Sequence, residues 1–380
     1  MKKVSIVLPT YNGAQYIRES IDSVLRQTYE NWELIIVDDC STDNTPEIIQ
    51  EYANRNSRIT VIRNEVNQKL PGALNHGFRA ASGDYYTWTS DDNIYDDDAI
   101  GLMTDFLEKN LEYGMVYCNI RRLDENGSFS MGDDALEPKY LYTGSYIGAC
   151  FMYRSTVAQT VGEYDPDMFL VEDYDYWLRI SKRYKLYYIP ECKYTYRVHS
   201  ASLSSTRLGQ FQVQAYRIRR KELDYLLEKI DEDEKEILFI TMWANRKKET
   251  WELRNKFFPG GVLPERLKWV EYRACTEETI DEGKPIILFG AGEFGRKALD
   301  YFGADRVFCF VDNNPYMKGK TVEGVSVISF EQLKEIHPHY QIVISVGRRF
   351  VSEVAGQLEA AGITDYTLFL GLYERLVSAG

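Results

Sequence analysis

The sequence lacks the patterns that mark several large classes of protein. Its six cysteines are widely scattered, and no two have the Cys-x-x-Cys spacing of a thiolate zinc site or a redox pair. No run of about 18 apolar residues occurs, so no transmembrane helix is expected. Lysine and arginine number 45 against 58 aspartates and glutamates, and the net charge of −13 argues against broad nucleic-acid binding.

No targeting signal is visible either. The N-terminus runs straight into an apolar strand and has no signal-peptide core, and the thiols are expected to be reduced, so a cytoplasmic location is predicted. Two basic patches, at 217–221 and 246–248, leave peripheral contact with the inner face of the membrane open. Their acidic neighbours favour a solvated helix face instead.

A chain of 380 residues suggests two or three domains, at roughly 100–200 residues each. We expect an α/β domain over 1–205, a charged helical connector over 206–282, and a second α/β domain over 283–380. In the first domain four apolar runs read as strands, with helical spacing between them: Val4–Leu8, Leu34–Val37, Ile59–Ile62 and Asp84–Trp88. This order favours a mostly parallel sheet covered on both faces. Further along, 186–189 and 193–198 read as two strands.

Two acidic pairs each follow one of these apolar runs. They are Asp38-Asp39 and Asp91-Asp92. Ligands of open α/β sheets bind at the carboxyl ends of the strands, so the two pairs predict a nucleotide-and-metal site there. Two carboxylates beside a diphosphate would repel it unless a cation lay between them, and Mg²⁺ or Mn²⁺ takes oxygen ligands. The alternative for Asp91-Asp92 is a solvated acidic turn that continues into 96–98.

The first pair suits recognition of a base. Asp39 could accept a hydrogen bond from the imide nitrogen of uracil. Pro9, Thr10 and Tyr11 form the neighbouring strand-to-loop turn, which would lay Tyr11 against the base. The alternative is that Asp39 merely starts an Asx-type turn with the serine and threonine that follow it.

Four ordered motifs together resemble a family 2 glycosyltransferase. They are VSIVLPTYN, LIIVDDCSTDNT, LNHGFRAASGDYYTWTSDDN and VEDYDYWLR, and the resemblance covers roughly residues 1–205. It implies the A-type glycosyltransferase fold, a nucleotide-binding α/β domain. It also implies that Asp92 is the main metal ligand and that Asp91 faces the ribose or donor sugar. His199 follows a strand where some relatives place a second metal ligand, although a lone histidine is usually structural.

The resemblance assigns two further functions. Lys69 occupies a region where the family often has a basic residue that approaches the diphosphate, and a plain surface lysine is the alternative. Glu172-Asp173 matches the family's ED motif, which places the catalytic base on Asp173 and Glu172 in the substrate site. An N-cap aspartate is the structural alternative for Asp173, and Asp175 is the nearest rival as base.

The last hundred residues carry a glycine motif. Gly290, Gly292 and Gly295 follow an apolar strand and open a helix, and Asp312 ends the next strand. This context predicts a Rossmann-like domain. Binding of NAD(P) or a nucleotide sugar there is a separate and less favoured hypothesis, and no Tyr-x-x-x-Lys follows.

The sequence therefore predicts a metal-dependent inverting glycosyltransferase. It would move a sugar from a nucleotide-sugar donor, with UDP as the expected nucleotide, to a hydroxyl of a glycan or lipid-linked acceptor in bacterial surface polysaccharide synthesis. The alternative is a bifunctional sugar-modifying enzyme whose C-terminal domain binds NAD(P) or a nucleotide sugar. A homodimer is compatible with two α/β domains and a helical connector.

Overall fold

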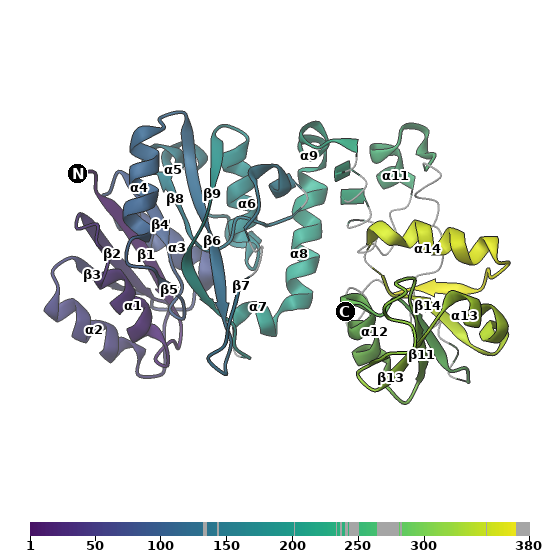
Figure 1. The fold of residues 1–380 in the computed structure, drawn as a ribbon. Coiled ribbons are helices and arrows are strands. Elements are labelled where there is room, and N and C mark those ends of the chain that lie inside the picture. Colours follow the sequence, from purple (N-terminus) through teal and green to yellow (C-terminus); the bar gives the residue numbers. More distant parts are fainter. Residues whose placement is uncertain are drawn as a thin grey trace. The chain divides into compact units, whose positions relative to one another are not determined.

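The chain forms two compact units, Met1–Ile230 and Asp231–Gly380, in a computed structural model (Figure 1). The structure describes residues 1–131, 135–142, 144–200, 202–232, 234–235, 238–239, 242, 251–263, 281, 283–346 and 348–369. The predicted boundaries at 205 and 282 stay predictions. Among the described residues no helix is both long and apolar enough to span a membrane.

The described part of the first unit is built on a nine-stranded sheet with the order β3-β2-β1-β4-β8-β6-β9-β5, in which β7 pairs with β6. Its strands are β1 (Val4–Thr10), β2 (Trp32–Asp38), β3 (Ile59–Arg63), β4 (Tyr85–Trp88), β5 (Ile94–Tyr95), β6 (Tyr113–Leu123), β7 (Phe129–Met131), β8 (Phe151–Arg154) and β9 (Lys185–Arg197). Its helices are α1 (Ile17–Leu25), α2 (Thr45–Arg55), α3 (Lys69–Ala80), α4 (Ala99–Lys109), α5 (Ser155–Val161), α6 (Glu172–Ser181), α7 (Leu203–Thr206), α8 (Leu208–Lys221) and α9 (Leu223–Lys229). Short 3₁₀ turns occupy η1 (Pro138–Tyr142) and η2 (Pro166–Met168).

The α/β class is confirmed, and the parallel pairing is concentrated in one half of the sheet. β3, β2, β1 and β4 are mutually parallel, whereas β4 meets β8 in antiparallel orientation. β6 pairs in parallel with β9 but in antiparallel with β7 and β8. The parallel half therefore brings the carboxyl ends of β1, β2 and β4 to one edge.

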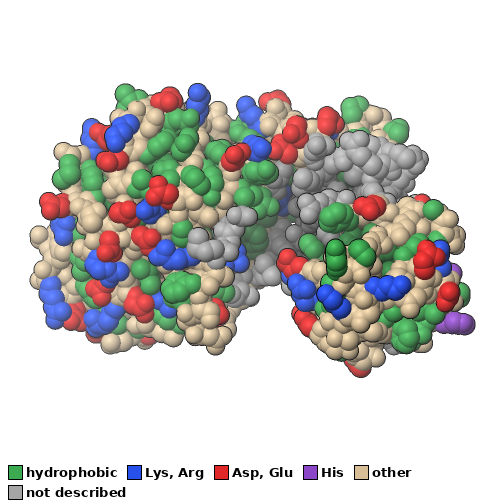
Figure 2. Space-filling model, viewed as in Figure 1, with side chains coloured by type: hydrophobic (Ala, Val, Ile, Leu, Met, Phe, Trp, Pro, Cys, Tyr) green, Lys and Arg blue, Asp and Glu red, His purple; other side chains and the backbone are tan. Residues whose placement is uncertain are grey.

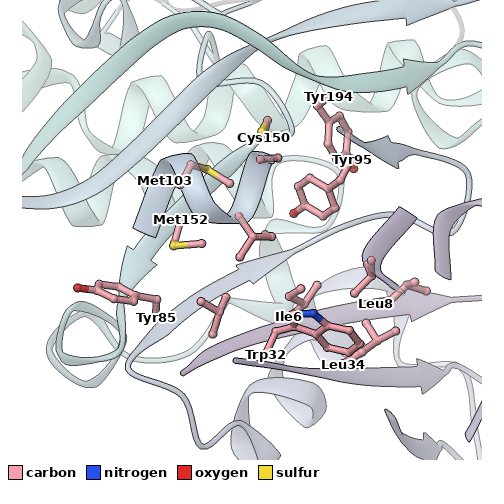
Figure 3. Close-up of a cluster of buried hydrophobic side chains, with 14 of the residues drawn as sticks. Ile6, Leu8, Trp32, Leu34, Tyr85, Tyr95, Met103, Cys150, Met152 and Tyr194 are labelled. Carbon is pink, nitrogen blue, oxygen red and sulfur yellow. The ribbon is translucent and has the colours of Figure 1, made fainter. Parts of the chain in front are cut away.

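Strands β1 and β2 of the parallel half are buried on both faces. Ile6 and Leu8 of β1 share one core cluster with side chains of α1 and α4 (Figure 3). Val7 points to the opposite face, where a Cβ added to Gly77 of α3 would lie 2.4 Å from Val7 Cγ1. Burial on both sides explains why these strands are continuous apolar runs instead of alternating patterns.

One sequence prediction about the second half of this sheet is wrong. The two expected strands at 186–189 and 193–198 form a single strand, β9, which pairs with β6 along almost its whole length. The register shifts where Ile189 pairs with Cys118 and Cys192 pairs with Asn119. Pro190 lies in that irregularity, where its missing N–H costs no ladder hydrogen bond.

The second unit has its own sheet, with the order β12-β13-β11-β10-β14-β15 in its described part. The elements of this unit are α11 (Trp251–Phe257), η3 (Pro259–Gly261), β10 (Ile286–Phe289), α12 (Glu293–Phe302), β11 (Val307–Val311), β12 (Thr321–Val322), β13 (Val325–Ile328), α13 (Phe330–Ile336), η6 (His337–His339), β14 (Gln341–Ile344), α14 (Arg348–Ala360) and β15 (Tyr366–Leu368). Its five parallel strands lie in the order β13-β11-β10-β14-β15. Numbered by their order in the chain they are 3-2-1-4-5, which matches the first five positions in the strand order of a doubly wound sheet. Assignment of a Rossmann-like domain stays a prediction.

Candidate functional site

The two acidic pairs meet at one edge of the first sheet. Thr10 ends β1 in register with Asp38 of β2, and the backbone N–H of Asp39 donates to the carbonyl of Thr10 at 2.8 Å. The hydroxyl of Thr10 donates to Asp91 Oδ2 at 2.5 Å. Thr10 thus joins the strand end that carries Asp39 to the loop that carries Asp91.

Asp38 has a structural role. Its side chain is fully buried, pairs with the guanidinium of Arg63, and accepts from the backbone N–H of Ser41 at 2.9 Å. The turn that the sequence offered as the alternative for Asp39 is therefore made by Asp38. This leaves the second aspartate of the pair for other partners.

Asp39 lies at the floor of the same edge and is 4% exposed. Its Oδ1 accepts from the side-chain amide of Asn64 at 2.7 Å and from the backbone N–H of Gln68 at 2.8 Å. Tyr11 follows Thr10 in the adjoining loop, and the residue is 52% exposed. Pro9 lies within β1 and pairs with Val37, so it fixes the strand from which that loop leaves.

Asp91 is partly buried, and this burial followed by the charge of Asp92 raises its pKa to about 7. The loop after β1 approaches it so closely that a Cβ on Gly13 would lie 2.1 Å from Asp91 Oδ2. Glycine is therefore the residue that this loop needs to pass the carboxylate. Asn93 is buried and accepts from the backbone N–H of Arg197 at 2.8 Å, which gives it a structural role.

Asp92 and His199 lie together. His199 Nε2 is 3.1 Å from Asp92 Oδ2, and the ring of Tyr16 packs on the imidazole with centroids 5.2 Å apart. Burial raises the pKa of Asp92 above its ordinary value, and the nearby His199 offsets only part of this rise. Arg197 donates from Nε to the backbone carbonyl of Asp92 at 3.0 Å and so holds the acidic loop against β9.

These residues fit a divalent cation. Asp92 Oδ1 is buried and has no hydrogen-bond partner among the described residues. A carboxylate oxygen and an imidazole nitrogen form a donor set that suits Mn²⁺. In the described residues no group of three or more His, Cys, Asp and Glu side chains is arranged to hold a metal ion. Further ligands would therefore come from a diphosphate and water.

Two cations flank one aromatic ring beside this edge. The ammonium of Lys69 is 5.2 Å from the centroid of Phe169, and the guanidinium of Arg207 is 5.7 Å from it. Lys69 has φ of +59°, which a non-glycine residue rarely adopts and which is common at functional sites. Sequence reasoning found Lys69 and missed Arg207, because the arginine lies beyond the last of the four motifs.

The ED motif forms the first turn of α6. The helix begins at Glu172 and its N-cap position is Val171, so Asp173 is not an N-cap. Burial raises the pKa of Asp173 to about 6, although the backbone N–H of Tyr174 donates to it. Burial and the charge of Asp173 raise the pKa of Glu172 to about 8, and Glu172 Oε2 is buried without a partner among the described residues.

Asp175, the rival candidate, is used within the fold. Its carboxylate is 3% exposed, accepts from Arg179 Nε at 2.7 Å, and lies 3.8 Å from the ammonium of Lys221. Two charged partners leave it little capacity to take a proton from a substrate. Of the two aspartates of α6, Asp173 is therefore the better candidate for the catalytic base.

An aromatic bridge ties α6 to the strand that leads to the acidic loop. The rings of Tyr164 and Tyr176 stack with centroids 4.0 Å apart. Trp88, the last residue of β4, donates from Nε1 to the hydroxyl of Tyr164 at 3.2 Å. The structure thus anchors the helix of Asp173 to the strand that ends three residues before Asp91.

The glycine motif of the second unit is held by its own aspartate. Asp312 Oδ2 accepts from the backbone N–H of Ala291 at 2.8 Å. A Cβ on Gly295 would lie 2.0 Å from the carbonyl oxygen of Gly290, whereas a Cβ on Gly292 would meet nothing within 4 Å. Gly295 and Asp312 therefore have structural functions, and binding of a dinucleotide stays a prediction.

The basic patch at 217–221 is partly used for contacts within the fold. Arg219 of α8 lies over the ring of Tyr174, and Lys221 is the partner of Asp175 already described. On the face drawn in Figure 2, basic and acidic side chains are interspersed over the first unit. The patch at 246–248 lies outside the described residues. Peripheral membrane contact stays a prediction.

The first unit is an α/β domain whose candidate ligand site lies where its parallel strands end, at the edge lined by carboxylates. The model of Glycosyl transferase family 2 matches residues 5–171. An uncharacterized glycosyltransferase of Rickettsia typhi is 32% identical over 220 residues, which are 55% of this chain and 68% of that protein. The chain belongs to this family and is a glycosyltransferase.

Two further comparisons agree with this assignment. EpsE of Bacillus subtilis, provisionally named a glycosyltransferase, is 33% identical over 205 residues, which cover 52% of this chain and 74% of EpsE. The crystal structure of S. aureus TarS 1–349 in complex with UDP-GlcNAc has a TM-score of 0.52 and 16% identity, and the match covers 71% of this chain and 87% of that one. At that identity the likeness concerns the fold, which is the A-type glycosyltransferase fold that the motifs predicted.

Proposed function

We propose that this glycosyltransferase is metal-dependent and inverts the configuration of the sugar it transfers, and that its donor is a UDP-sugar. The observation that carries the proposal is the convergence of Asp39 and Asp91-Asp92 on one sheet edge, with Asp92 Oδ1 buried and unpartnered among the described residues. Asp39 would accept from the imide N–H of uracil, and the exposed ring of Tyr11 would lie against the base.

The diphosphate would lie between the acidic loop and the two cations. Asp92 and His199 would hold the divalent cation, which would neutralise charge on the departing diphosphate. Lys69 and Arg207 have no carboxylate partner among the described residues, in a chain with net charge −13. Both are therefore suited to bind the phosphate oxygens from the other side. Asp91, held by Thr10, would face the ribose or donor sugar.

Asp173 would act as the base. It would accept the proton of the acceptor hydroxyl as that oxygen attacks the anomeric carbon, on the face opposite the leaving diphosphate. Attack from that face inverts the anomeric configuration. The raised pKa of about 6 makes Asp173 a better proton acceptor than an ordinary aspartate while leaving it ionised at neutral pH.

The acceptor class rests on relatives. TuaG of Bacillus subtilis, 29% identical over 208 residues, is provisionally named as a glycosyltransferase of teichuronic acid biosynthesis. We propose a hydroxyl of a glycan or lipid-linked glycan in bacterial surface polysaccharide synthesis as the acceptor.

A transfer assay with labelled nucleotide sugars tests the proposal. The full chain, mixed with UDP-, CDP- and ADP-linked sugars and Mn²⁺, should release nucleoside diphosphate from a UDP donor fastest. Equal rates for all donors, or rates unaffected by chelation, would overturn it.

A further inference from the structure

Asp39 is held by a chain of side chains that no sequence motif suggested. Asn64 follows β3 and is 6% exposed, and its Nδ2 donates to Asp39 Oδ1 at 2.7 Å. The other end of the same amide meets α3, where Asn64 Oδ1 lies 2.6 Å from Nδ1 of His76. The three side chains form a continuous hydrogen-bonded row that ends at the edge where the base would bind.

The direction of this row follows from the chemistry of its members. An ionised carboxylate accepts hydrogen bonds and donates none, so the amide of Asn64 must turn its NH₂ toward Asp39. Its oxygen must then face His76, which fixes Nδ1 of the imidazole as a donor, since the opposite orientation would set two acceptors against each other. Every hydrogen bond of the row therefore points toward Asp39.

We propose that Asn64 and His76 are positioning residues that hold Asp39 as a hydrogen-bond acceptor and so select the donor nucleotide by its base. The inference rests on the proposed contact between Asp39 and the base. Uracil, thymine and guanine present a ring N–H, which an acceptor satisfies. Cytosine and adenine present a bare ring nitrogen, and two facing acceptors leave a buried polar group unpaired.

The geometry makes these side chains separable from the fold. The backbone N–H of Asn64 donates to the carbonyl of Asp38 at 2.9 Å, and this bond does not depend on the side chain. His76 is only partly buried, so changes of its ring nitrogens leave the packing of α3 in place. The backbone N–H of Gln68 also reaches Asp39, so one donor remains when Asn64 is changed.

Calorimetric titration of the full chain with UDP and CDP, in the presence of Mn²⁺, tests the inference. Asn64→Asp should weaken UDP binding about tenfold or more and shrink the preference for UDP over CDP, because it removes the donor to Asp39. Asn54→Asp makes the same change on the exposed surface of α2 and should alter neither value. kcat at saturating donor should change little, since neither positioning residue touches the reacting atoms.

Two variants of His76 separate hydrogen bonding from shape. His76→Phe keeps the ring and loses the donor, so the UDP preference should fall. His76→Asn places an amide nitrogen near the position of Nδ1 and should restore most of it. Thermal unfolding of each variant checks that the fold is intact, and the histidine pair decides the matter if Asn64→Asp does not fold.

The outcomes distinguish two failures. If Asp39→Asn abolishes the UDP preference while Asn64→Asp and His76→Phe retain it, the positioning inference is wrong and the proposed base contact stands. If Asp39→Asn binds UDP as the wild type does, the base contact itself is wrong.

Discussion

Both units of this chain place an aspartate where a parallel strand ends, but the two aspartates differ in what their oxygens contact. In the first unit Asp92 Oδ1 is buried without a partner among the described residues, next to a histidine. In the second unit both carboxylate oxygens of Asp312 accept hydrogen bonds from the backbone, Oδ2 from the N–H of Ala291 and Oδ1 from the N–H of Asn314. An acid at a strand end therefore indicates a ligand site only when the local chain does not satisfy it.

The glycines repeat this contrast. The loop that contains Gly13 passes close to the carboxylate of Asp91 in the candidate site. A Cβ added to Gly13 would lie only 2.1 Å from Asp91 Oδ2. Gly295 lets a helix pass the backbone of its own strand-to-helix turn, where the built Cβ lies 2.0 Å from the oxygen of Gly290. The same absence of a side chain makes room beside a candidate ligand site in one unit and allows close helix packing in the other.

The largest effect should come from Asp173, the proposed base of the first unit. Asp173→Asn should lower kcat by about 10²–10⁴-fold, because an amide cannot accept the proton of the acceptor hydroxyl. Binding of UDP, measured by calorimetry, should stay within about twofold, since Asp173 would face the acceptor in the proposed mechanism.

Two matched changes control for the loss of a charge. Asp167→Asn makes the same substitution on the exposed turn η2 and should leave kcat unchanged. Asp312→Asn does so in the second unit and should also leave the transfer rate unchanged. A comparable loss with Asp312→Asn would mean that the second unit takes part in transfer, and the contrast between the units would fail.

Metal dependence should also be affected by changes in the first unit and not by changes in the second. His199→Ala should raise the Mn²⁺ concentration needed for half-maximal UDP binding by at least about tenfold, because the proposed site loses a ligand. His339→Ala, an exposed histidine of the second unit, is the control and should have no effect. Chelation should reduce transfer by about 100-fold. Undiminished UDP binding in EDTA would rule out the cation.

The second unit should respond in stability and not in activity. Gly295→Ala should destabilise it by about 1–3 kcal/mol, because the added methyl group must displace the backbone of the preceding loop. Gly292→Ala has open space and should leave stability nearly unchanged. Denaturant unfolding of the full chain, with sugar transfer measured in parallel, checks both. Equal losses for the two variants would show that the loop geometry does not decide the effect.

The sequence was informative where one local pattern decides the outcome. Continuous apolar runs predicted the buried strands β1 and β2, and the acidic pairs predicted which sheet edge to examine. The long strand β9 was missed because a proline in a strand normally ends it, and only pairing with β6 shows that a register irregularity accommodates Pro190.

The partners of the candidate residues could not be predicted. Asn64 and His76 are 12 residues apart and become neighbours only because α3 packs back against the sheet. Arg207 contacts the ring of Phe169 although the two residues are 38 positions apart in the sequence (207 − 169). The sequence assigned base recognition to Asp39, but it could not show that Asp38 accepts from the backbone N–H of Ser41 and pairs with Arg63.

The smallest expected effect tests the assignment within the ED motif itself. Because burial raises the pKa of Asp173 to about 6, the base is protonated in an increasing fraction of molecules as pH falls below that value. kcat/KM should therefore rise through pH 6 to a plateau and lose about tenfold per pH unit well below it. Glu172 still holds its proton in this range, as its pKa is about 8, so Glu172→Gln should leave the midpoint near pH 6 even if it lowers the rate. A midpoint near pH 4 would mean that Asp173 is hydrated like an ordinary aspartate. If kcat/KM of Glu172→Gln no longer rose with pH, Glu172 and not Asp173 would be the base.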